Sequence, residues 1–272
     1  MKRTERVGAM IKILTDTPSR VYPLQYFCDL FGAAKSSVSE DLQAASRAVE
    51  STGTGKIETI AGAHGGARFV PDISDKAASD LQEEFCRKIS DPGRILTGGF
   101  LYTSDLMFDP VFAGRVADVF VRAFRDCGAD CVATVETKGI PLALAVSEKL
   151  ALPLIVIRRE AKVSDGSTVS INYFSGSYDR IQKMSVARRA VTPGAKALII
   201  DDFMRGGGSI KGITDILAEF DATVAGVGVA IASVLPERKK IENYTAVIFL
   251  GNVDEENKTI EAYPNKNVFS GR

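Results

Sequence analysis

The spacing of apolar residues changes near residue 73 and divides the chain into two parts. Before this point, apolar residues recur every three or four positions, as on one face of a helix. After about residue 94, short continuous apolar runs such as 131–135 and 197–200 alternate with amphipathic segments. Such runs are typical of strands that are buried on both faces of a parallel sheet. The pattern predicts an α/β protein with domains 1–73 and 74–272, the second being a doubly wound, mostly parallel sheet.

The first domain has the pattern of a winged helix. Helices are expected over 3–14, 24–31 and 35–49. Gly32 lies in the short turn between the second and third of these, which matches helix-turn-helix geometry. The segments 56–60 and 67–70 then flank a glycine-rich tip, as in a β-hairpin. This order of elements predicts a winged-helix domain.

A winged helix most often binds double-stranded DNA through its third helix and its hairpin. The residues expected to contact DNA are Lys2, Arg3, Arg6, Lys35, Ser36, Ser37, Ser39, His64 and Arg68. Charge supports this assignment only weakly, because nine basic and seven acidic residues give residues 1–71 a net charge of +2. A protein-interaction or dimerisation module therefore remains an alternative for this domain.

The segment 197–212 predicts a binding site for an anion in the second domain. A buried strand ends on Asp201 and Asp202, and three glycines and Ser209 precede an amphipathic helix. Glycines allow backbone N–H groups to converge on a phosphate, and the start of a helix adds partial positive charge. The segment is not a Walker loop, because no G-x-x-x-x-G-K-[ST] occurs. An ordinary strand–turn–helix junction is the alternative interpretation.

Two further loops are expected beside this segment, because ligands of open α/β sheets bind at the carboxyl ends of the strands. The loops 136–139 and 158–162 follow predicted strands and, together with the 201–209 loop, complete the edge. The basic residues of these three loops are Lys138, Arg158, Arg159, Lys162 and Arg205. We expect a ligand that carries phosphates at both ends of a sugar. Residues 161–180 are expected to form a long hairpin or flap.

Composition narrows the class of protein further. The 272 residues carry no net charge, 45% are hydrophobic, and no apolar run is long enough for a membrane span. Four scattered cysteines and a single histidine make a disulfide framework or a zinc site improbable. We expect a cytoplasmic protein without a resident metal and with no membrane partner.

The acid pair and its loop resemble the phosphoribosyl pyrophosphate (PRPP) motif of type I phosphoribosyltransferases, although Arg205 and Gly206 stand where the enzymes usually have threonines. This departure is usual in the purine operon repressors of Gram-positive bacteria, which the chain resembles over nearly its whole length. The segments that carry the resemblance are Ala34–Asp41, Gly98–Tyr102, Thr137–Gly139, Gly166–Tyr173 and Asp201–Arg205.

The resemblance implies a dimeric transcription regulator of purine synthesis genes whose phosphoribosyltransferase-like domain has no catalytic residues. PRPP with Mg²⁺ would be its effector. Guanosine tetraphosphate (ppGpp) would be a competing ligand, with Tyr102 stacking on the base. The expected effector-binding residues are Asp201, Asp202, Phe203, Met204, Arg205, Gly206, Gly207, Gly208, Ser209, Thr137, Lys138, Gly139, Arg158, Lys162 and Tyr102.

The sequence leaves two other functions open. One is an active purine phosphoribosyltransferase with an accessory N-terminal domain, and the other is a ribose-phosphate-binding module without DNA contact. Whether a regulator of this kind represses or activates, and which operator it reads, does not follow from the residues.

Overall fold

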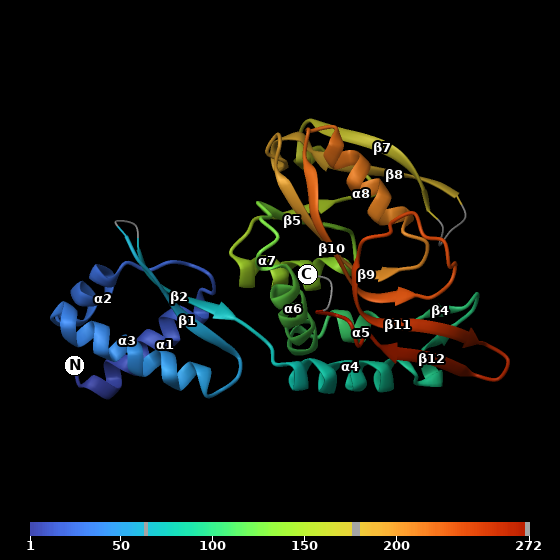
Figure 1. Cartoon of the computed structure of the whole chain (residues 1–272). Coiled ribbons are helices and arrows are strands. Elements are labelled where there is room, and N and C mark those ends of the chain that lie inside the picture. Colours follow the sequence, from blue (N-terminus) through green and yellow to red (C-terminus); the bar gives the residue numbers. More distant parts are fainter. Residues whose placement is uncertain (63–64, 176–179, 270–272) are drawn as a thin grey trace. The chain divides into compact units, whose positions relative to one another are not determined.

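The chain folds into two compact units, which are described separately. The computed structural model describes residues 1–62, 65–175 and 180–269. The first unit contains Met1–Asp75 and Glu148–Ala151, and the second contains Lys76–Ser147 and Leu152–Arg272 (Figure 1). Among the described residues, no helix has both the length and the apolar character needed to cross a membrane.

The N-terminal unit is a winged helix, as predicted. Its elements are α1 (Arg3–Asp16), α2 (Leu24–Phe31), α3 (Lys35–Glu50), β1 (Gly55–Ile60) and β2 (Gly66–Pro71). Gly32 adopts a left-handed conformation with φ of 59°, which ends α2 and allows the turn into α3. Met10, Phe27 and Val38, one from each helix, are fully buried in a common core.

The hairpin of this unit is fastened to the start of α2. β1 and β2 pair antiparallel, and Tyr22 forms an additional bridge with Ala67 of β2. Gly66 must be a glycine, because a Cβ there would collide with the carbonyl oxygen of Tyr22. The hairpin therefore has a fixed base beside the helix-turn-helix.

The C-terminal unit is built on a six-stranded sheet. In sheet order its strands are β12 (Thr259–Pro264), β11 (Thr245–Asp254), β10 (Thr223–Ser233), β9 (Lys196–Met204), β5 (Cys131–Val135) and β6 (Leu154–Ile157). Every neighbouring pair is parallel except β11 and β12. All five parallel strands therefore present their carboxyl ends at the same edge. This confirms the predicted mostly parallel sheet.

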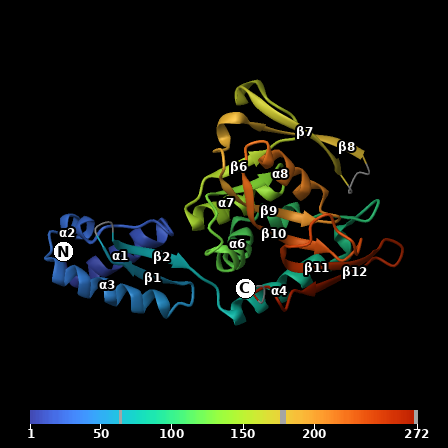
Figure 2. The same cartoon turned by 45° about the horizontal axis from the view of Figure 1, so that its top comes forward.

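Helices cover both faces of this sheet. α8 (Gly208–Ala218) connects β9 to β10 and packs on one face together with Val227 and Val229. α6 (Pro110–Phe124) covers the opposite face, where Gly226 and Gly228 leave room for the rings of Phe124 and Phe120. α7 (Gly139–Leu150) connects β5 to β6, away from β9 (Figures 1 and 2). Since the two crossovers leave in opposite directions, β5 and β9 form the topological switch point, where open sheets bind ligands.

The remaining elements complete the unit around this sheet. α4 (Asp75–Ile89), the short strands β3 (Ile95–Leu96) and β4 (Phe100–Leu101), and α5 (Ser104–Met107) precede α6. The predicted hairpin is present as β7 (Thr168–Ser175) and β8 (Arg180–Ala187), so it extends beyond the expected residue 180. Tyr173 and Met184 of this hairpin are buried against α8, where a Cβ on Gly212 would lie 2.9 Å from the sulfur of Met184. The hairpin is therefore part of the core.

Candidate functional site

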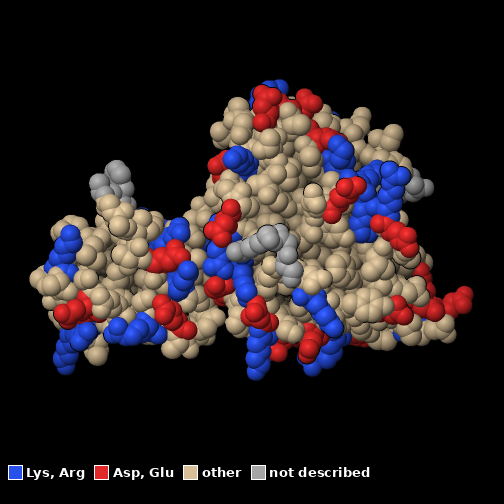
Figure 3. Space-filling model, viewed as in Figure 1, with Lys and Arg blue, Asp and Glu red and all other residues tan. Residues whose placement is uncertain are grey.

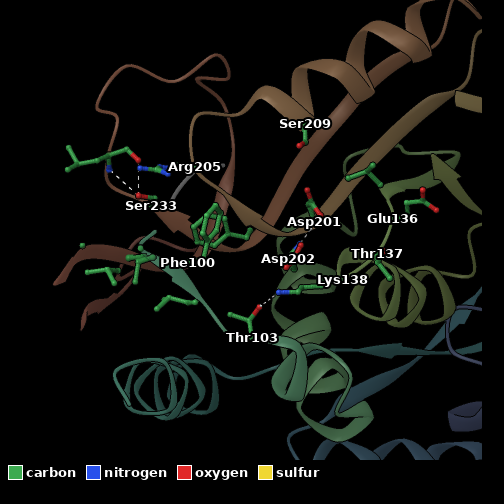
Figure 4. Close-up of a pocket in the computed structure, with 18 of the residues that line it drawn as sticks. Phe100, Thr103, Glu136, Thr137, Lys138, Asp201, Asp202, Arg205, Ser209 and Ser233 are labelled. Atoms are coloured by element: carbon green, nitrogen blue, oxygen red, sulfur yellow. Dashed lines mark hydrogen bonds between the residues drawn. The ribbon is translucent and has the colours of Figure 1, made fainter. Parts of the chain in front are cut away.

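A cavity of about 540 Å³ lies at the carboxyl edge of the sheet, across the switch point. The ends of the parallel strands contribute 135–138, Arg159, 201–203, Arg205, Ser209, Ser233, Leu235 and 250–253. Residues 99–101 and Thr103, which precede the sheet in the chain, complete the lining. In Figure 4, Asp201 and Asp202 lie near Lys138, whereas Phe100, Arg205 and Ser233 occupy the other part. The loops after β5, β6 and β9 therefore meet as the sequence predicts. The segment around Tyr102, expected here from the family resemblance, also contributes, and the ends of β10 and β11 were not expected.

Two carboxylates occupy the end of β9 without a full set of partners. Asp201 is only 4% exposed, and one of its oxygens accepts a hydrogen bond from the backbone N–H of Asp202 at 3.0 Å. Burial, and secondarily the charge of Asp202, raises the pKa of Asp201 well above its usual value. Burial also raises the pKa of Asp202, although nearby Lys138 opposes this effect. Such a pair favours a ligand that brings hydroxyl groups or a cation to it.

Gly139, the first residue of α7, fits directly against this pair. A Cβ at Gly139 would lie 2.5 Å from a carboxylate oxygen of Asp201 and 2.5 Å from the hydroxyl oxygen of Thr134. A side chain at this position would therefore displace the carboxylate. Within the described residues, the buried Thr134 hydroxyl has no hydrogen-bond partner. The start of α7 and the end of β9 thus form one tightly packed junction.

The loop 205–208 is supported from behind by the segment that follows β10. Gly207 has φ of 79° and is the N-cap of α8. The Lys239 ammonium donates to the carbonyl of Arg205 at 3.0 Å, and the Lys240 N–H donates to the carbonyl of Gly206 at 3.0 Å. In the part of the chain that the structure describes, the N–H groups of Gly206 and Gly207 do not donate to a backbone carbonyl. The loop therefore has its carbonyls held and its amides available for an anion.

Among the residues that the structure describes, three cationic side chains line the cavity. These are Lys138, Arg159 and Arg205. The Lys138 ammonium donates to the hydroxyl of Thr103 at 3.3 Å. The backbone N–H of Arg159 donates to Glu136 at 2.7 Å. Positive charge is thus distributed on two sides of the acid pair, as a ligand with two separated phosphate groups requires.

The predicted effector residues separate into those on the cavity wall and those outside it. On the wall are Asp201, Asp202, Phe203, Arg205, Ser209, Thr137 and Lys138. Gly139, Gly206 and Gly208 are adjacent in the chain to wall residues, and Gly207 is two residues from Arg205 and from Ser209. The Met204 side chain differs from the expectation, because it is 2% exposed and packs in the core. It offers the cavity no side-chain group.

Arg158, Lys162 and Tyr102 also lie off the wall. Arg158 bridges through its backbone to Ser185, and its guanidinium is 3.8 Å from Glu136 and 3.7 Å from Asp165. Lys162 and Tyr102 are exposed, and neither lines the cavity. A role for these three residues in effector binding stays a prediction.

The sequence did not single out Phe100, Thr103, Ser233, Leu235 and Asn252, which also line the cavity. Ser233 and Asn252 could have been predicted to line the cavity, because each lies near the carboxyl end of a parallel strand. Phe100 and Thr103 come from a segment before the sheet, and no local pattern indicates that it folds over the strand ends. These residues give the cavity a part with aromatic, aliphatic and amide groups beside its charged part.

The N-terminal unit has a second cavity, of about 560 Å³, between α3 and the hairpin. Lys35, Ser39 and Gln43 line it at intervals of four residues along α3, and Thr59 faces it from β1. Ala34 gives α3 no side-chain cap, so the first N–H groups of this helix are available to an outside acceptor. Ser36 is exposed and Ser37 is partly exposed at the same end. The arrangement fits contact with phosphate groups.

Some basic residues of this unit form ion pairs with acidic residues of the same unit. Arg6 is 16% exposed and pairs with buried Asp41 at 2.6 Å, so its expected DNA contact stays a prediction. Arg68 pairs with Glu58 at 2.9 Å but remains 37% exposed. His64 lies outside the described residues. In the view of Figure 3, acidic and basic side chains alternate over this unit, in agreement with its small net charge.

Both units of the chain match families of known proteins. Residues 2–71 match the family model of the bacterial purine repressor N-terminal domain, and residues 110–262 match that of the phosphoribosyl transferase domain. The purine biosynthesis transcriptional repressor PurR of Bacillus subtilis is 38% identical over 260 residues, covering 96% of this chain and 91% of that protein. The chain belongs to the purine biosynthesis transcriptional regulators. The family resemblance found in the sequence is thereby confirmed.

This family contains regulators of both signs. The purine biosynthesis transcriptional activator PurR of Lactococcus lactis (strain IL1403) is 34% identical over 96% of each chain. The xanthine phosphoribosyltransferase of Listeria monocytogenes is more distant, at 28% identity over 61% of this chain and 88% of the enzyme. The chain therefore groups with the regulators and not with the enzymes.

Solved enzyme structures confirm the fold of the C-terminal unit. The adenine phosphoribosyltransferase of Saccharomyces cerevisiae superposes with a TM-score of 0.53 at 15% identity, covering 62% of this chain and 97% of the enzyme. That of Thermoanaerobacter pseudethanolicus gives a TM-score of 0.52 at 18% identity, covering 60% of this chain and 96% of the enzyme. At these identities the likeness concerns the fold alone.

Proposed function

We propose that this regulator binds DNA through its N-terminal unit and senses PRPP, together with Mg²⁺, through the cavity at the sheet edge. The observation that carries the proposal is the presence of a buried acid pair and a supported glycine loop in one cavity, with cations beside both. Asp201 and Asp202 would accept hydrogen bonds from the ribose hydroxyls. The amides of the 206–209 loop would hold the 5′-phosphate.

The pyrophosphate of PRPP would then lie toward Lys138 and Arg159, which line the same cavity. Mg²⁺ prefers oxygen ligands and is usually held by one or two carboxylates together with ligand phosphates. The acid pair therefore fits the cation, which would neutralise the pyrophosphate. Burial removes water from the two carboxylates and so disfavours their ionised form. A cation and two ribose hydroxyl groups would replace that water as interaction partners.

The other part of the cavity favours ppGpp as a competing ligand. Phe100 and Leu250 offer an aromatic ring and an aliphatic side chain to a base, and Asn252 offers an amide that can hydrogen-bond to a base edge. Tyr102 was expected to stack on this base, but it lies off the wall, whereas Phe100 lies on the wall beside Leu250 and Asn252 in the lining. We therefore propose Phe100 for the stacking contact.

The DNA contacts are proposed for Lys2, Arg3, Arg68 and the first turns of α3, which contain Lys35, Ser36, Ser37 and Ser39. We also propose that the regulator is a homodimer. We propose a cytoplasmic location, because the regulator needs access both to DNA and to PRPP. Family members include a repressor and an activator, so the sign of regulation is left open.

Calorimetric titration of the full-length protein with PRPP in MgCl₂ tests the effector. We expect PRPP to bind more tightly than ribose 5-phosphate or pyrophosphate alone, because the cavity offers groups to both ends. Equal affinity for pyrophosphate and PRPP, or no heat with PRPP, would contradict the proposed binding mode.

Competition between PRPP and ppGpp tests the second ligand. Phe100→Ala should weaken ppGpp binding at least about fivefold, the effect of losing roughly 1 kcal/mol of base stacking, and leave PRPP binding within twofold. Tyr102→Ala is the matched control and should change neither. The reverse result would assign the base contact to Tyr102.

A further inference from the structure

Asp41, on α3 of the N-terminal unit, is a buried carboxylate with two arginine partners. Its side chain is 1% exposed. The Nε of Arg6 donates to one carboxylate oxygen at 2.6 Å, and the Nε of Arg3 donates to the other at 3.1 Å. Both arginines belong to the first turns of α1. A buried charge is stable only when it is paired in this way, so the contact fixes the start of α1 against α3.

The two arginines differ in what remains of their hydrogen-bonding capacity. Arg6 is 16% exposed, and its Nη1 donates to the carbonyl of Met1 at 3.1 Å. Arg3 is 58% exposed, and within the described residues its two terminal nitrogens have no partner. Since Asp41 uses only the Nε of Arg3, the terminal nitrogens keep their N–H donors in a planar fork. That fork is the geometry with which arginine binds phosphate.

The free fork lies in a part of the domain with further donors. Lys2 precedes Arg3 and is exposed, and α3, which holds Asp41, begins with exposed Lys35 and Ser36. One acid and two arginines leave a net charge of +1 at this position, and that charge resides on the more exposed side chain. The sequence shows two equivalent arginines three residues apart, whereas the structure gives them different surroundings.

We propose that Asp41 is a positioning residue for DNA binding. It retains Arg6 as a strut between α1 and α3, and it holds Arg3 by the Nε so that the terminal nitrogens of Arg3 contact a DNA phosphate. The inference rests on the proposed DNA-binding function, and it removes Arg6 from the set of DNA contacts.

The salt dependence of DNA binding distinguishes the phosphate contact proposed for Arg3 from the structural role proposed for Arg6. The full-length protein is titrated with duplex DNA from upstream of its own purine biosynthesis genes at several salt concentrations. Each phosphate contact contributes about 0.9 to the slope of log affinity against log salt. Arg3→Ala should reduce that slope by about one. Arg6→Ala should leave the slope unchanged and lower the melting temperature of the N-terminal unit by at least about 5 °C.

Lys12→Ala is the matched control on the same helix. Lys12 is 73% exposed and, among the residues that the structure describes, pairs only with Asp16, one turn further along α1. We expect neither the salt slope nor the melting temperature to change. If the wild-type protein binds no DNA, the proposed function fails. If the wild type binds and Arg6→Ala reduces the slope as much as Arg3→Ala, only the inference about Asp41 fails.

A double-mutant cycle measures the positioning itself. In an Asp41→Asn background the Arg3 side chain is less firmly held, so Arg3→Ala should cost less affinity than it does in the wild type. Equal costs in both backgrounds would overturn the positioning role. Should Asp41→Asn fail to fold, Arg3→Lys tests the held fork: it keeps the charge but lacks the fork and the Nε contact, so affinity should fall while the slope stays, and an unchanged affinity would overturn the inference.

Discussion

Asp41 of the N-terminal unit and Asp201 of the C-terminal unit are both nearly inaccessible to water, with exposures of 1% and 4%. Asp41 is paired with two guanidinium groups of its own chain. Asp201 accepts one backbone hydrogen bond and faces a second acid, Asp202. A buried carboxylate that is neutralised within the fold contributes to stability, whereas one left beside another acid lowers stability and depends on a ligand.

Removing the carboxylate that is paired should have the largest effect on stability. Asp41→Ala leaves Arg6 without its partner in a mostly buried position, and we expect a loss of about 3 kcal/mol in the unfolding free energy of the N-terminal unit. Thermal or urea unfolding measures this change. Asp16→Ala, which breaks an exposed pair with Lys12, is the control and should cost at most about 0.5 kcal/mol. Similar costs for both variants would remove the distinction drawn for Asp41.

Asp201→Asn should affect ligand binding and stability in opposite directions. Loss of a charge-assisted hydrogen bond of about 1.5–3 kcal/mol predicts PRPP affinity lower by roughly 10–100-fold in calorimetry. The melting temperature of the C-terminal unit should stay the same or rise, because a neutral amide replaces a carboxyl group whose ionisation is disfavoured by burial beside Asp202. A clear fall in melting temperature would show instead that Asp201 is a structural residue like Asp41. Asp215→Asn, on the exposed side of α8, is the control and should change neither quantity.

The pH dependence of stability sharpens the same comparison. Because burial raises the pKa of Asp201 in the folded state, the folded protein holds a proton that the unfolded chain releases above the ordinary aspartate pKa. This contribution to stability is present at low pH and is lost as the pH rises through the raised pKa. The melting-temperature advantage of Asp201→Asn over the wild type should therefore shrink as the pH is lowered from 7 toward 4. An advantage that is constant over this range would contradict the raised pKa.

The smallest effect is expected behind the glycine loop. Lys239→Met removes a donor to the carbonyls of Arg205 and Pro236, so the loop should hold its amides less firmly. One lost hydrogen bond of about 1 kcal/mol predicts roughly fivefold weaker PRPP binding, with DNA binding unchanged. Arg238→Met replaces the exposed neighbouring cation and should have no effect. Equal losses in both variants would indicate general electrostatic attraction rather than positioning.

Much of this molecule could be predicted from its sequence, because periodicity reports local structure. The helical spacing over 3–14 and the apolar runs at 131–135 and 197–200 correspond to α1, β5 and β9. The rule that ligands bind at strand ends correctly brought Lys138 and Asp201 into one cavity.

The sequence was least informative where the surroundings of a side chain depend on a distant partner. Arg3 and Arg6 look alike until Asp41, 35 or more positions away, is placed between them. Arg158 and Arg159 are neighbours, yet only Arg159 lines the cavity, because successive residues at a strand end point to different sides. Phe100 reaches the cavity through the placement of a short hairpin relative to the sheet, which periodicity does not contain.

The central claim is that PRPP bound at the buried acid pair controls DNA binding. Fluorescence anisotropy of labelled DNA from upstream of the protein's own purine biosynthesis genes, with and without saturating Mg²⁺–PRPP at fixed salt, tests it most directly. We predict a change in affinity of roughly 5–150-fold, corresponding to a coupling of about 1–3 kcal/mol, and we expect Asp201→Asn to lose this change while binding DNA normally. Identical affinity with and without PRPP, in a protein shown by calorimetry to bind PRPP, would contradict the account.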